Sequence, residues 1–354
     1  RARHEKSAAL AALAAGRIGV LIGPAGTGKT TLLQALCDEP QVKDGGILLL
    51  APTGKARVRM EQQIRSASGR TLAQFLLQHD RYDGETGRYH LSDRPASTSH
   101  KTVIVDEASM LTEDMLAALL DALKGVERLI LVGDPRQLPP IGAGRPFVDV
   151  VRRLQPEDIE SRHPRVGPGY AELTVIRRSV GEDRDDLLLA NWFSGRPMEP
   201  AADAVWSAPA EASKHLRFVR WDTPEALPGL LLQTLAEEIE GIESVGDELG
   251  FEISLGGLDY NGGVYFWAGR KPNEAGAAAR AEDWQILSPV RQQAHGVESL
   301  NKALHDAFRS KAMAFASRRH ARKVPRPAGP EAIIYGDKVI NLRKNFGQTA
   351  AMMA

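Results

Sequence analysis

The sequence has a single cysteine, Cys37, among its 354 residues, and this scarcity excludes an internal disulfide. Because disulfide-built proteins belong to oxidising compartments, we expect a cytoplasmic protein. Long apolar runs are also missing: none reaches the roughly 20 residues that span a bilayer, so no membrane segment is expected. The nine histidines are scattered without the spacing of metal ligands, which argues against a structural metal site.

An excess of charge of either sign is absent too, because 45 Lys and Arg residues balance 45 Asp and Glu residues. A neutral protein is poorly suited to grip duplex DNA through its overall field. The balance is compatible with a narrow channel for a single strand, where local charge and base stacking decide binding. The chain opens on Arg1 instead of Met and stops at Ala354 without a recognisable final element, so we expect a piece of a longer protein.

Short apolar segments alternate with helical ones in the first half of the sequence, which is the pattern of a parallel α/β sheet. Most are nearly continuous apolar runs, as expected for strands covered on both faces. Between two of them, Thr112 caps a helix with apolar residues at helical spacing from Met115 to Leu123, and Gly125 ends it. The predicted strands are residues 18–22, 46–51, 102–105, 128–132 and 172–175.

One segment interrupts this alternation. Residues 81–89 place glycine-containing turn residues between arms that carry Tyr82 and Tyr89, which predicts a β-hairpin. The length is sufficient for two domains, and the second half is less regular. There we predict a helix at 226–242, a glycine-rich insert of strands and loops at 246–276, a strand at 284–287, a helix from near Val297, a basic loop at 318–326 and a strand or hairpin at 333–342.

Residues 23–30 match the phosphate-loop pattern Gly-x-x-x-x-Gly-Lys-Ser/Thr, between a predicted strand and a predicted helix. Glycines let backbone N–H groups curl around the β-phosphate, and the helix N-terminus adds positive potential. In such a loop Lys29 bridges the β- and γ-phosphates, and the Thr30 hydroxyl binds Mg²⁺. The alternative is a turn that binds nothing, which the complete motif disfavours. The predicted nucleotide-binding residues are Gly23, Pro24, Ala25, Gly26, Thr27, Gly28, Lys29, Thr30 and Thr31.

Two acidic residues, Asp106 and Glu107, follow the predicted strand 102–105. A carboxylate at the C-terminal end of a strand is placed for a second Mg²⁺ contact, which we assign to Asp106. Glu107 can polarise the attacking water as a general base. An acidic cap before Ala108 would explain an isolated pair, but the phosphate loop favours the catalytic interpretation.

A polar loop, Gly-Asp-Pro-Arg-Gln-Leu-Pro-Pro at 133–140, follows the next predicted strand. Gln137 in this loop can sense the γ-phosphate, and the prolines stiffen the loop so that sensing moves the chain. From these residues alone, an ordinary turn after a strand explains the segment equally well.

These segments, together with Ala-Pro-Thr-Gly-Lys-Ala at 51–56, occur in the order and spacing of superfamily 1 helicases and most resemble the RecD branch, the exonuclease V alpha-subunit type. Residues 285–291 and 296–301 resemble the second motor domain of that branch, and 335–341 resemble the start of its SH3-like insertion. The resemblance covers most of the chain and is more specific in its first half. It implies an α/β fold with a RecA-like P-loop NTPase domain at 1–176 carrying a hairpin insertion at about 77–100, part of a second RecA-like domain at 177–301, and a truncated SH3-like insertion at 302–354.

The resemblance also implies a function: an ATP-dependent DNA helicase or translocase that uses ATP and Mg²⁺ and moves 5′→3′ on single-stranded DNA. Its partners would be single-stranded DNA, duplex junctions, and a nuclease or other subunits of a complex for DNA repair or recombination. By the same resemblance Gln137 couples nucleotide state to DNA grip, and the DNA-binding residues are Thr53, Gly54, Lys55 and Thr71. The hairpin falls where the family inserts a small domain that splits duplex strands; a decorative loop is the alternative.

A catalytic arginine is expected after residue 176, where it would reach the γ-phosphate across a domain cleft and stabilise the transferred charge. The family shows Leu-Thr, three variable residues, then Arg followed by Gln or Ser. The sequence Leu-Thr-Val-Ile-Arg-Arg-Ser at 173–179 puts Arg178 in that register, with Arg177 as the alternative.

The chain departs from the family in two places. The family has a Gln before the phosphate loop that reads adenine, and Lys6 stands near that position here, which puts base selectivity in doubt. The last two family motifs do not occur before Ala354, and one of them contributes a second arginine finger. The composite ATP site is therefore expected to be incomplete in this chain.

Two other functions are consistent with parts of the sequence. A P-loop kinase would share the phosphate loop, but the four ordered motifs and the lack of an evident phosphoacceptor pocket disfavour it. A module that binds nucleotide and DNA with little turnover is the stronger alternative, because the late motifs are missing.

Overall fold

The structure is a computed structural model that describes residues 1–64, 67–175, 185–194, 206, 215–267, 276–318, 324–329 and 331–339. The chain divides into two compact units, Arg1–Arg217 and Phe218–Ala354. The domain boundaries at 176 and 301 that the family resemblance implies stay predictions. Among the helices of the described ranges, none has the length and apolar character needed to cross a bilayer.

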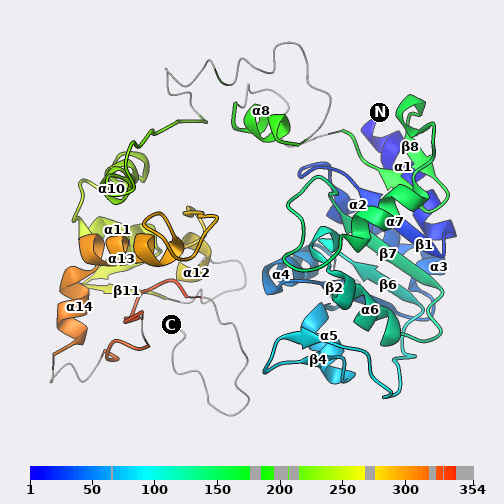
Figure 1. Cartoon of the computed structure of the whole chain (residues 1–354), viewed down its shortest axis with the longest axis horizontal. Helices are drawn as coiled ribbons and strands as arrows, with labels where there is room; N and C mark the ends of the chain where they lie inside the picture. The colour runs from blue at the N-terminus through cyan, green and yellow to red at the C-terminus, as the bar shows by residue number, and fades with distance from the viewer. Residues whose placement is uncertain are drawn as a thin grey trace. The chain divides into compact units, whose positions relative to one another are not determined.

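Unit 1 is built on a seven-stranded sheet whose order is β3-β2-β6-β7-β1-β9-β8 (Figure 1). Neighbouring strands are parallel except β8 and β9, which are antiparallel. The sheet confirms the predicted α/β fold with a mostly parallel sheet. Its strands are β1 (Ile18–Ile22), β2 (Ile47–Ala51), β3 (Gly69–Thr71), β6 (Thr102–Val105), β7 (Arg128–Gly133), β8 (Arg165–Gly167) and β9 (Tyr170–Glu172).

Helices cover both faces of this sheet and make it the middle of three layers. One face packs against α1 (Ala2–Ala15), α2 (Lys29–Asp38), α3 (Pro40–Lys43) and α4 (Gly54–Gln63). The other face packs against α5 (Leu72–Gln78), α6 (Glu113–Asp121), α7 (Pro146–Leu154) and the short 3-10 helices η1 (Ala108–Met110) and η2 (Ile159–Ser161). Helix α8 (Asp185–Trp192) follows later in the unit.

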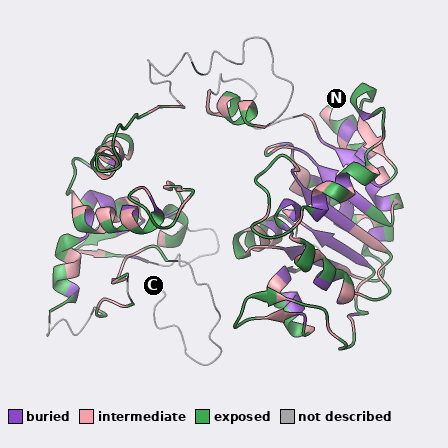
Figure 2. Cartoon of the chain, viewed as in Figure 1, coloured by how far each residue is buried: buried purple, intermediate pink, exposed green. Residues whose placement is uncertain are grey.

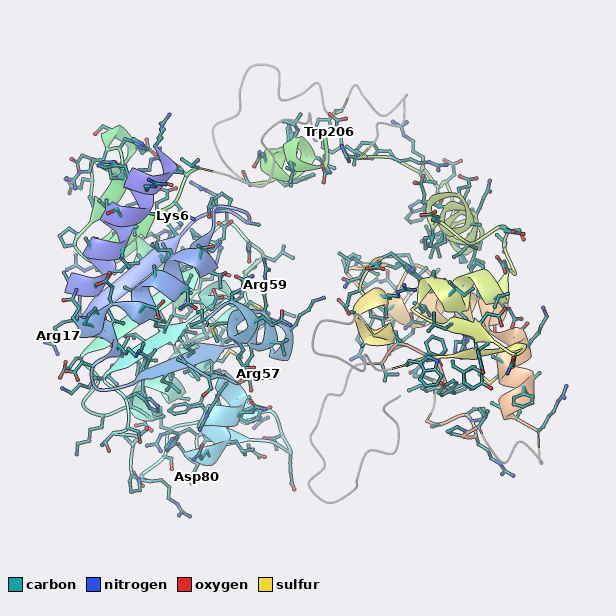
Figure 3. The ribbon with its side chains drawn as sticks, turned by 180° about the vertical axis from the view of Figure 1, so that it is seen from behind. Lys6, Arg17, Arg57, Arg59, Asp80 and Trp206 are labelled. Atoms are coloured by element: carbon teal, nitrogen blue, oxygen red, sulfur yellow. The ribbon has the colours of Figure 1, made fainter. Side chains whose placement is uncertain are left out.

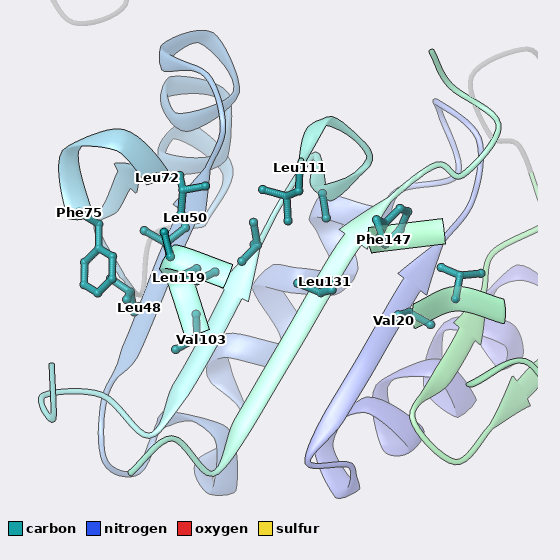
Figure 4. Close-up of a cluster of buried hydrophobic side chains, with 14 of the residues drawn as sticks. Val20, Leu48, Leu50, Leu72, Phe75, Val103, Leu111, Leu119, Leu131 and Phe147 are labelled. Atoms are coloured by element: carbon teal, nitrogen blue, oxygen red, sulfur yellow. The ribbon is translucent and has the colours of Figure 1, made fainter. Parts of the chain in front are cut away.

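Successive side chains of each central strand alternate between the two layers of core. In β6, Val103 and Val105 face the α5–α6–α7 layer and Ile104 faces the α1–α2–α4 layer. Both sets are fully buried, which explains why these strands are nearly continuous apolar runs. Figure 4 shows the first cluster, and Figure 2 shows how burial follows the strands.

Two of the predicted elements of unit 1 differ from the expected bounds by more than one residue. The strand predicted at 172–175 is β9, Tyr170–Glu172, because Tyr170 pairs with Val20 of β1 and the chain leaves the ladder after Glu172. Helix α6 begins at the predicted cap, Thr112, but ends at Asp121 and not at Gly125. It stops early because the next residues pair with Ser97, whose N–H donates to the Ala122 carbonyl (2.7 Å) and whose carbonyl accepts from Lys124 N (2.9 Å).

The predicted hairpin is present as β4 (Tyr82–Asp83) and β5 (Arg88–Tyr89), with Tyr82 opposite Tyr89. Their ring centroids lie 4.7 Å apart. The buried Arg81 guanidinium holds the base of the hairpin, since it donates to Asp121 (2.7 Å) and to three backbone carbonyls. The predicted β-hairpin is therefore confirmed, whereas its standing as a family insertion at about 77–100 and its role in strand separation stay predictions.

Unit 2 is a helical unit with a small antiparallel hairpin. Its core joins Ile242, Phe251 and Phe308, and the Phe251 and Phe308 rings stack at 4.7 Å. Its elements are α10 (Leu227–Glu238), α11 (Glu248–Ser254), β10 (Leu258–Tyr260), β11 (Gly263–Tyr265), α12 (Ala277–Arg280), α13 (Val297–Phe308) and α14 (Ser310–Ala316).

The predictions for this half are correct for the helices at 226–242 and from Val297, correct in part for the insert at 246–276, which contains the hairpin β10–β11, and wrong for the strand at 284–287. Residues 246–276 contain helix α11, and 284–287 form no strand: the Trp284 indole N–H donates to Ser254 Oγ (3.2 Å) and its ring packs against the core. In 333–339 only Ile333 makes a β-bridge, to Ala328. No parallel strand pair occurs in the described part of unit 2, so a second RecA-like domain with an SH3-like insertion stays a prediction. Residues 319–323 and 340–354 lie outside the described residues.

Candidate functional site

Four loops meet at one edge of the unit 1 sheet, because β1, β2, β6 and β7 are parallel and all end there. Strand β1 leads into the phosphate loop, β6 into Asp106 and Glu107, and β7 into the loop that begins at Asp134. Strand β2 leads into α4. The carboxyl edge of an open parallel sheet is where such folds bind ligands, so this edge is the candidate nucleotide site.

The backbone of the phosphate loop requires its glycines. Gly26 and Gly28 both have a φ of 84°, a backbone conformation that residues other than glycine adopt only under strain. A Cβ at Gly23 would lie 2.6 Å from the Leu173 carbonyl oxygen. Helix α2 starts at Lys29, directly after Gly28. The predicted strand–loop–helix arrangement is therefore confirmed, with α2's first N–H groups at the loop.

Three carboxylates from two other strands act on the loop's lysine. Lys29 Nζ donates to the carbonyl oxygens of Gly23 (2.7 Å) and Pro24 (3.3 Å). Burial lowers the pKa of Lys29, while the charges of Asp134, Glu107 and Asp106 raise it. The fold thus brings the ends of β1, β6 and β7 together as the sequence predicted, with Asp134 as an additional carboxylate.

The Asp106–Glu107 pair stands at the end of β6. The Asp106 N–H donates to Leu50 O (2.9 Å), so the sheet ladder fixes this residue, and its Oδ1 accepts from Glu107 N–H (2.9 Å). Glu107 has a φ of 52°, a strained value for a non-glycine residue and one often found at functional sites. Burial raises the pKa of the Asp106 carboxyl, and Lys29 acts in the opposite direction.

The loop after β7 is tied to the segment after β6. Asp134 is buried, and its Oδ1 accepts from Arg136 N–H (3.1 Å) while its carbonyl accepts from Gln137 N–H (3.1 Å). Ser109 Oγ donates to Gln137 Oε1 at 3.5 Å. Because η1 follows Glu107 directly, Gln137 is connected to the proposed base through one short helix.

Two of the predicted DNA-binding residues have a structural function as well. Thr53 caps α4, with its Oγ1 accepting from Ala56 N–H (3.2 Å). Thr71 caps α5 through a reciprocal pair of bonds with Gln74. Gly54 and Lys55, in the first turn of α4, are exposed. Their contact with DNA stays a prediction.

Arg59 is a charged residue near this site that the sequence interpretation did not include. It lies on α4, one turn after Lys55 (Figure 3). Burial is the largest cause of both pKa shifts: it raises the pKa of Asp106 and lowers the pKa of Lys29. The Arg59 guanidinium has a smaller effect and lowers both pKa values. Only the sheet order reveals this, because α4 follows β2 and β2 lies beside β6.

The two oxygen donors predicted for Mg²⁺ lie on the same edge, Thr30 in the first turn of α2 and Asp106 after β6. In the described ranges no group of three or more His, Cys, Asp or Glu side chains is arranged to hold a metal ion. Nucleotide-bound Mg²⁺ needs only one or two protein ligands, since phosphates and waters supply the rest. The donor set fits that kind of site. Arg177 and Arg178 lie outside the described residues.

A cavity of about 480 Å³ lies beside this site. It is lined by Arg136, Arg165, Glu172 and Thr174, among others, and not by Lys29 or the Asp106–Glu107 pair. The buried Glu172 carboxylate in the cavity wall already accepts hydrogen bonds from Arg165 (3.2 Å) and the Tyr170 hydroxyl (3.3 Å). We assign the cavity no part in the nucleotide site.

Comparison with known families matches residues 2–183 to the family described as AAA domain. This range contains the phosphate loop, the Asp106–Glu107 pair and Gln137.

Curated relatives of known type also match this chain. The RecD subunit of the RecBCD enzyme from Mycolicibacterium smegmatis is 33% identical over 245 residues, covering 63% of this chain and 40% of that protein. The ATP-dependent RecD2 DNA helicase of Deinococcus radiodurans is 37% identical over 147 residues, covering 41% of this chain and 19% of that protein. The chain thus spans less than half the length of these relatives.

Among solved structures, Bacteroides Pif1 bound to single-stranded DNA matches with a TM-score of 0.39 and 19% identity, covering 68% of this chain and 56% of that one. Pif1 helicase from Candida albicans matches with a TM-score of 0.41 and 19% identity, covering 67% and 54%. By its family match and its RecD relatives, the chain belongs to the AAA domain family and is a distant homologue of the RecD-type superfamily 1 helicases.

Proposed function

We propose that this chain is the ATP-hydrolysing part of a DNA helicase or translocase that moves 5′→3′ on single-stranded DNA. The observation that carries the proposal is the meeting of the phosphate-loop lysine with the carboxylates after β6 and β7 at one sheet edge. A general glycine-rich turn would not need three acidic groups from two other strands around its lysine.

Each residue of the edge has a defined part in this chemistry. Lys29 would bind the β- and γ-phosphates, and Thr30 and Asp106 would hold Mg²⁺, which would neutralise charge on the phosphates. Glu107 takes the proton of the attacking water. Gln137 senses the γ-phosphate, and its contact with Ser109 connects it to the segment that carries Glu107. Arg178, or alternatively Arg177, stabilises the charge that develops during transfer.

The DNA contacts are proposed at the neighbouring helix ends. Thr53, Gly54 and Lys55 begin α4 at the end of β2, on the same sheet edge as the nucleotide site. Helix N-termini favour phosphate groups, so a DNA backbone suits this position. Arg59 lies on the same helix and acts electrostatically on Asp106, which gives a short physical route between the two ligands. A nuclease or other subunits as partners follow from the RecD relatives alone and are proposed on that ground.

The test is the steady-state ATPase rate of this chain with and without single-stranded DNA. We expect DNA to stimulate the rate, Lys29→Ala to abolish it, and Lys43→Ala, an exposed lysine of α3, to leave it unchanged. Glu107→Gln should lower kcat by about 10²- to 10⁴-fold while nucleotide still binds.

Equal rates for the wild type and Lys29→Ala would overturn the motor proposal. If the wild-type chain then still binds ATP and DNA, it is a module that binds both ligands with little turnover.

A further inference from the structure

Helix α1 is fixed over the phosphate loop by a buried carboxylate. Glu5 is 1% exposed, and its Oε1 accepts hydrogen bonds from Thr174 N–H (2.8 Å) and Thr174 Oγ1 (2.7 Å). Ala9 and Leu13 of the same helix are fully buried in the sheet's core. These contacts set the rotation of α1, so the side chain that follows Glu5 has a defined position.

That side chain is Lys6, which Figure 3 labels, and its end lies close to Gly28 of the phosphate loop. Its Nζ occupies the space that a Cβ at Gly28 would need, and its Cε lies 3.4 Å from that position. Thr31 Oγ1 lies 3.8 Å from the same point. The Lys6 ammonium therefore fits beside Gly28 because glycine has no side chain. As a result, the first turn of α2 has a second ammonium beside it in addition to that of Lys29.

The hydrogen-bonding capacity of an ammonium decides which part of a nucleotide Lys6 can recognise. Lysine offers three donors and no acceptor, so it cannot accept from the 6-amino group that distinguishes adenine from guanine. At a loop whose N–H groups and helix N-terminus already favour anions, a compact positive charge favours phosphate oxygens.

We propose that Lys6 is a second phosphate-contacting lysine of this site, so that the site recognises the triphosphate and not the base. The proposal rests on the proposed function, because it assumes that the loop binds nucleoside triphosphates. Two consequences follow: ATP and GTP bind with similar affinity, and inorganic tripolyphosphate competes with both.

The experiment is equilibrium titration of the full chain with Mg²⁺ complexes of ATP, GTP and tripolyphosphate. Lys6→Gln should weaken all three by a similar factor of about 10, Lys6→Arg should retain most of the affinity, and Arg3→Gln, an exposed cation on the same helix, should change nothing. Circular dichroism of each variant checks that α1 remains folded.

Unchanged affinities in Lys6→Gln, or a wild-type preference of more than about tenfold for ATP over GTP, would overturn the proposal. Lys29→Ala in the same titration separates the two levels. If Lys29→Ala weakens binding while Lys6→Gln does not, only the role of Lys6 fails; if the wild type binds none of the three probes, the nucleotide site itself fails.

Discussion

Single residues at the site show what a local motif can and cannot predict. The phosphate loop was predictable because its glycines and Lys29 are adjacent in sequence and serve one backbone turn. The positions of Asp106, Glu107 and Gln137 at this sheet edge were predictable because each follows a strand, whereas their catalytic roles stay predictions. The effect of Arg59 on Asp106 was not predictable, since it depends on α4 following β2, the strand beside β6, and no local sequence pattern shows that arrangement.

The one cysteine yields a prediction at the same scale. Cys37 is fully buried in α2, and burial, with a smaller effect from Asp38, raises the pKa of its thiol to about 12. The thiol therefore stays protonated at pH 8 and unreactive, since the thiolate is the nucleophile. We expect Ellman's reagent to leave the folded chain unlabelled and to label one thiol per chain in denaturant.

The raised pKa of Cys37 also makes the stability of the folded chain depend on pH. The unfolded thiol ionises near pH 8.5 while the folded one holds its proton, so the contribution of Cys37 to stability is complete below that pH and is lost as the pH rises towards 12. Labelling of the folded chain at the rate of a free thiol would contradict the burial of Cys37.

At the scale of elements, the central strands were predictable and the edges were not. Strands β1 and β6 have their predicted bounds because continuous apolar runs between helices leave no other place to be buried. Strand β9 was misplaced because its pairing with β1 begins at Tyr170, before the apolar run that follows. The sequence of residues 284–287 is typical of a strand, but in the structure the Trp284 ring packs against a core built from helices.

The cap of α6 gives a prediction for one element. Thr112 Oγ1 accepts from Met115 N–H at 3.3 Å, and Glu113 and Asp114 add favourable charge in the first turn. Thr112→Ala should cost about 1 kcal/mol, which corresponds to about fivefold faster hydrogen exchange in α6. Thr112→Ser keeps the hydroxyl and should exchange as the wild type does. Equal exchange in the alanine and serine variants would show that the cap does not hold this helix.

At the scale of the whole molecule, the two units differ in how far the sequence determined them. Unit 1 alternates strands and helices around one sheet, and the pattern of apolar residues in the sequence predicted this alternation. The described part of unit 2 is held by contacts between distant segments: Arg309, 1% exposed, forms ion pairs with Glu252 and Asp337 and donates to the Tyr335 carbonyl (2.5 Å). No local pattern predicts which carboxylates a buried arginine meets.

This buried cluster leads to a prediction that separates the units. Arg309→Met leaves the Glu252 and Asp337 carboxylates without their cation, and breaking a buried pair costs about 3–5 kcal/mol. Hydrogen exchange in α11 and α13 should therefore accelerate strongly, whereas Arg318→Met, at an exposed position, should leave it unchanged. Nucleotide affinity should be the same in both variants, because the residues of the candidate site belong to unit 1. Wild-type protection of α11 and α13 in Arg309→Met would refute this account of unit 2.

The phosphate loop is tested most directly by calorimetric titration of the chain with Mg²⁺·ATP. Loss of the Lys29 ammonium removes charge-assisted bonds to the phosphates, so Lys29→Ala should bind about 10- to 100-fold more weakly than the wild type. Lys43→Ala, which removes an exposed lysine from α3, should bind with wild-type affinity at one site per chain. Wild-type affinity in Lys29→Ala would contradict the assignment of this sheet edge as the nucleotide site.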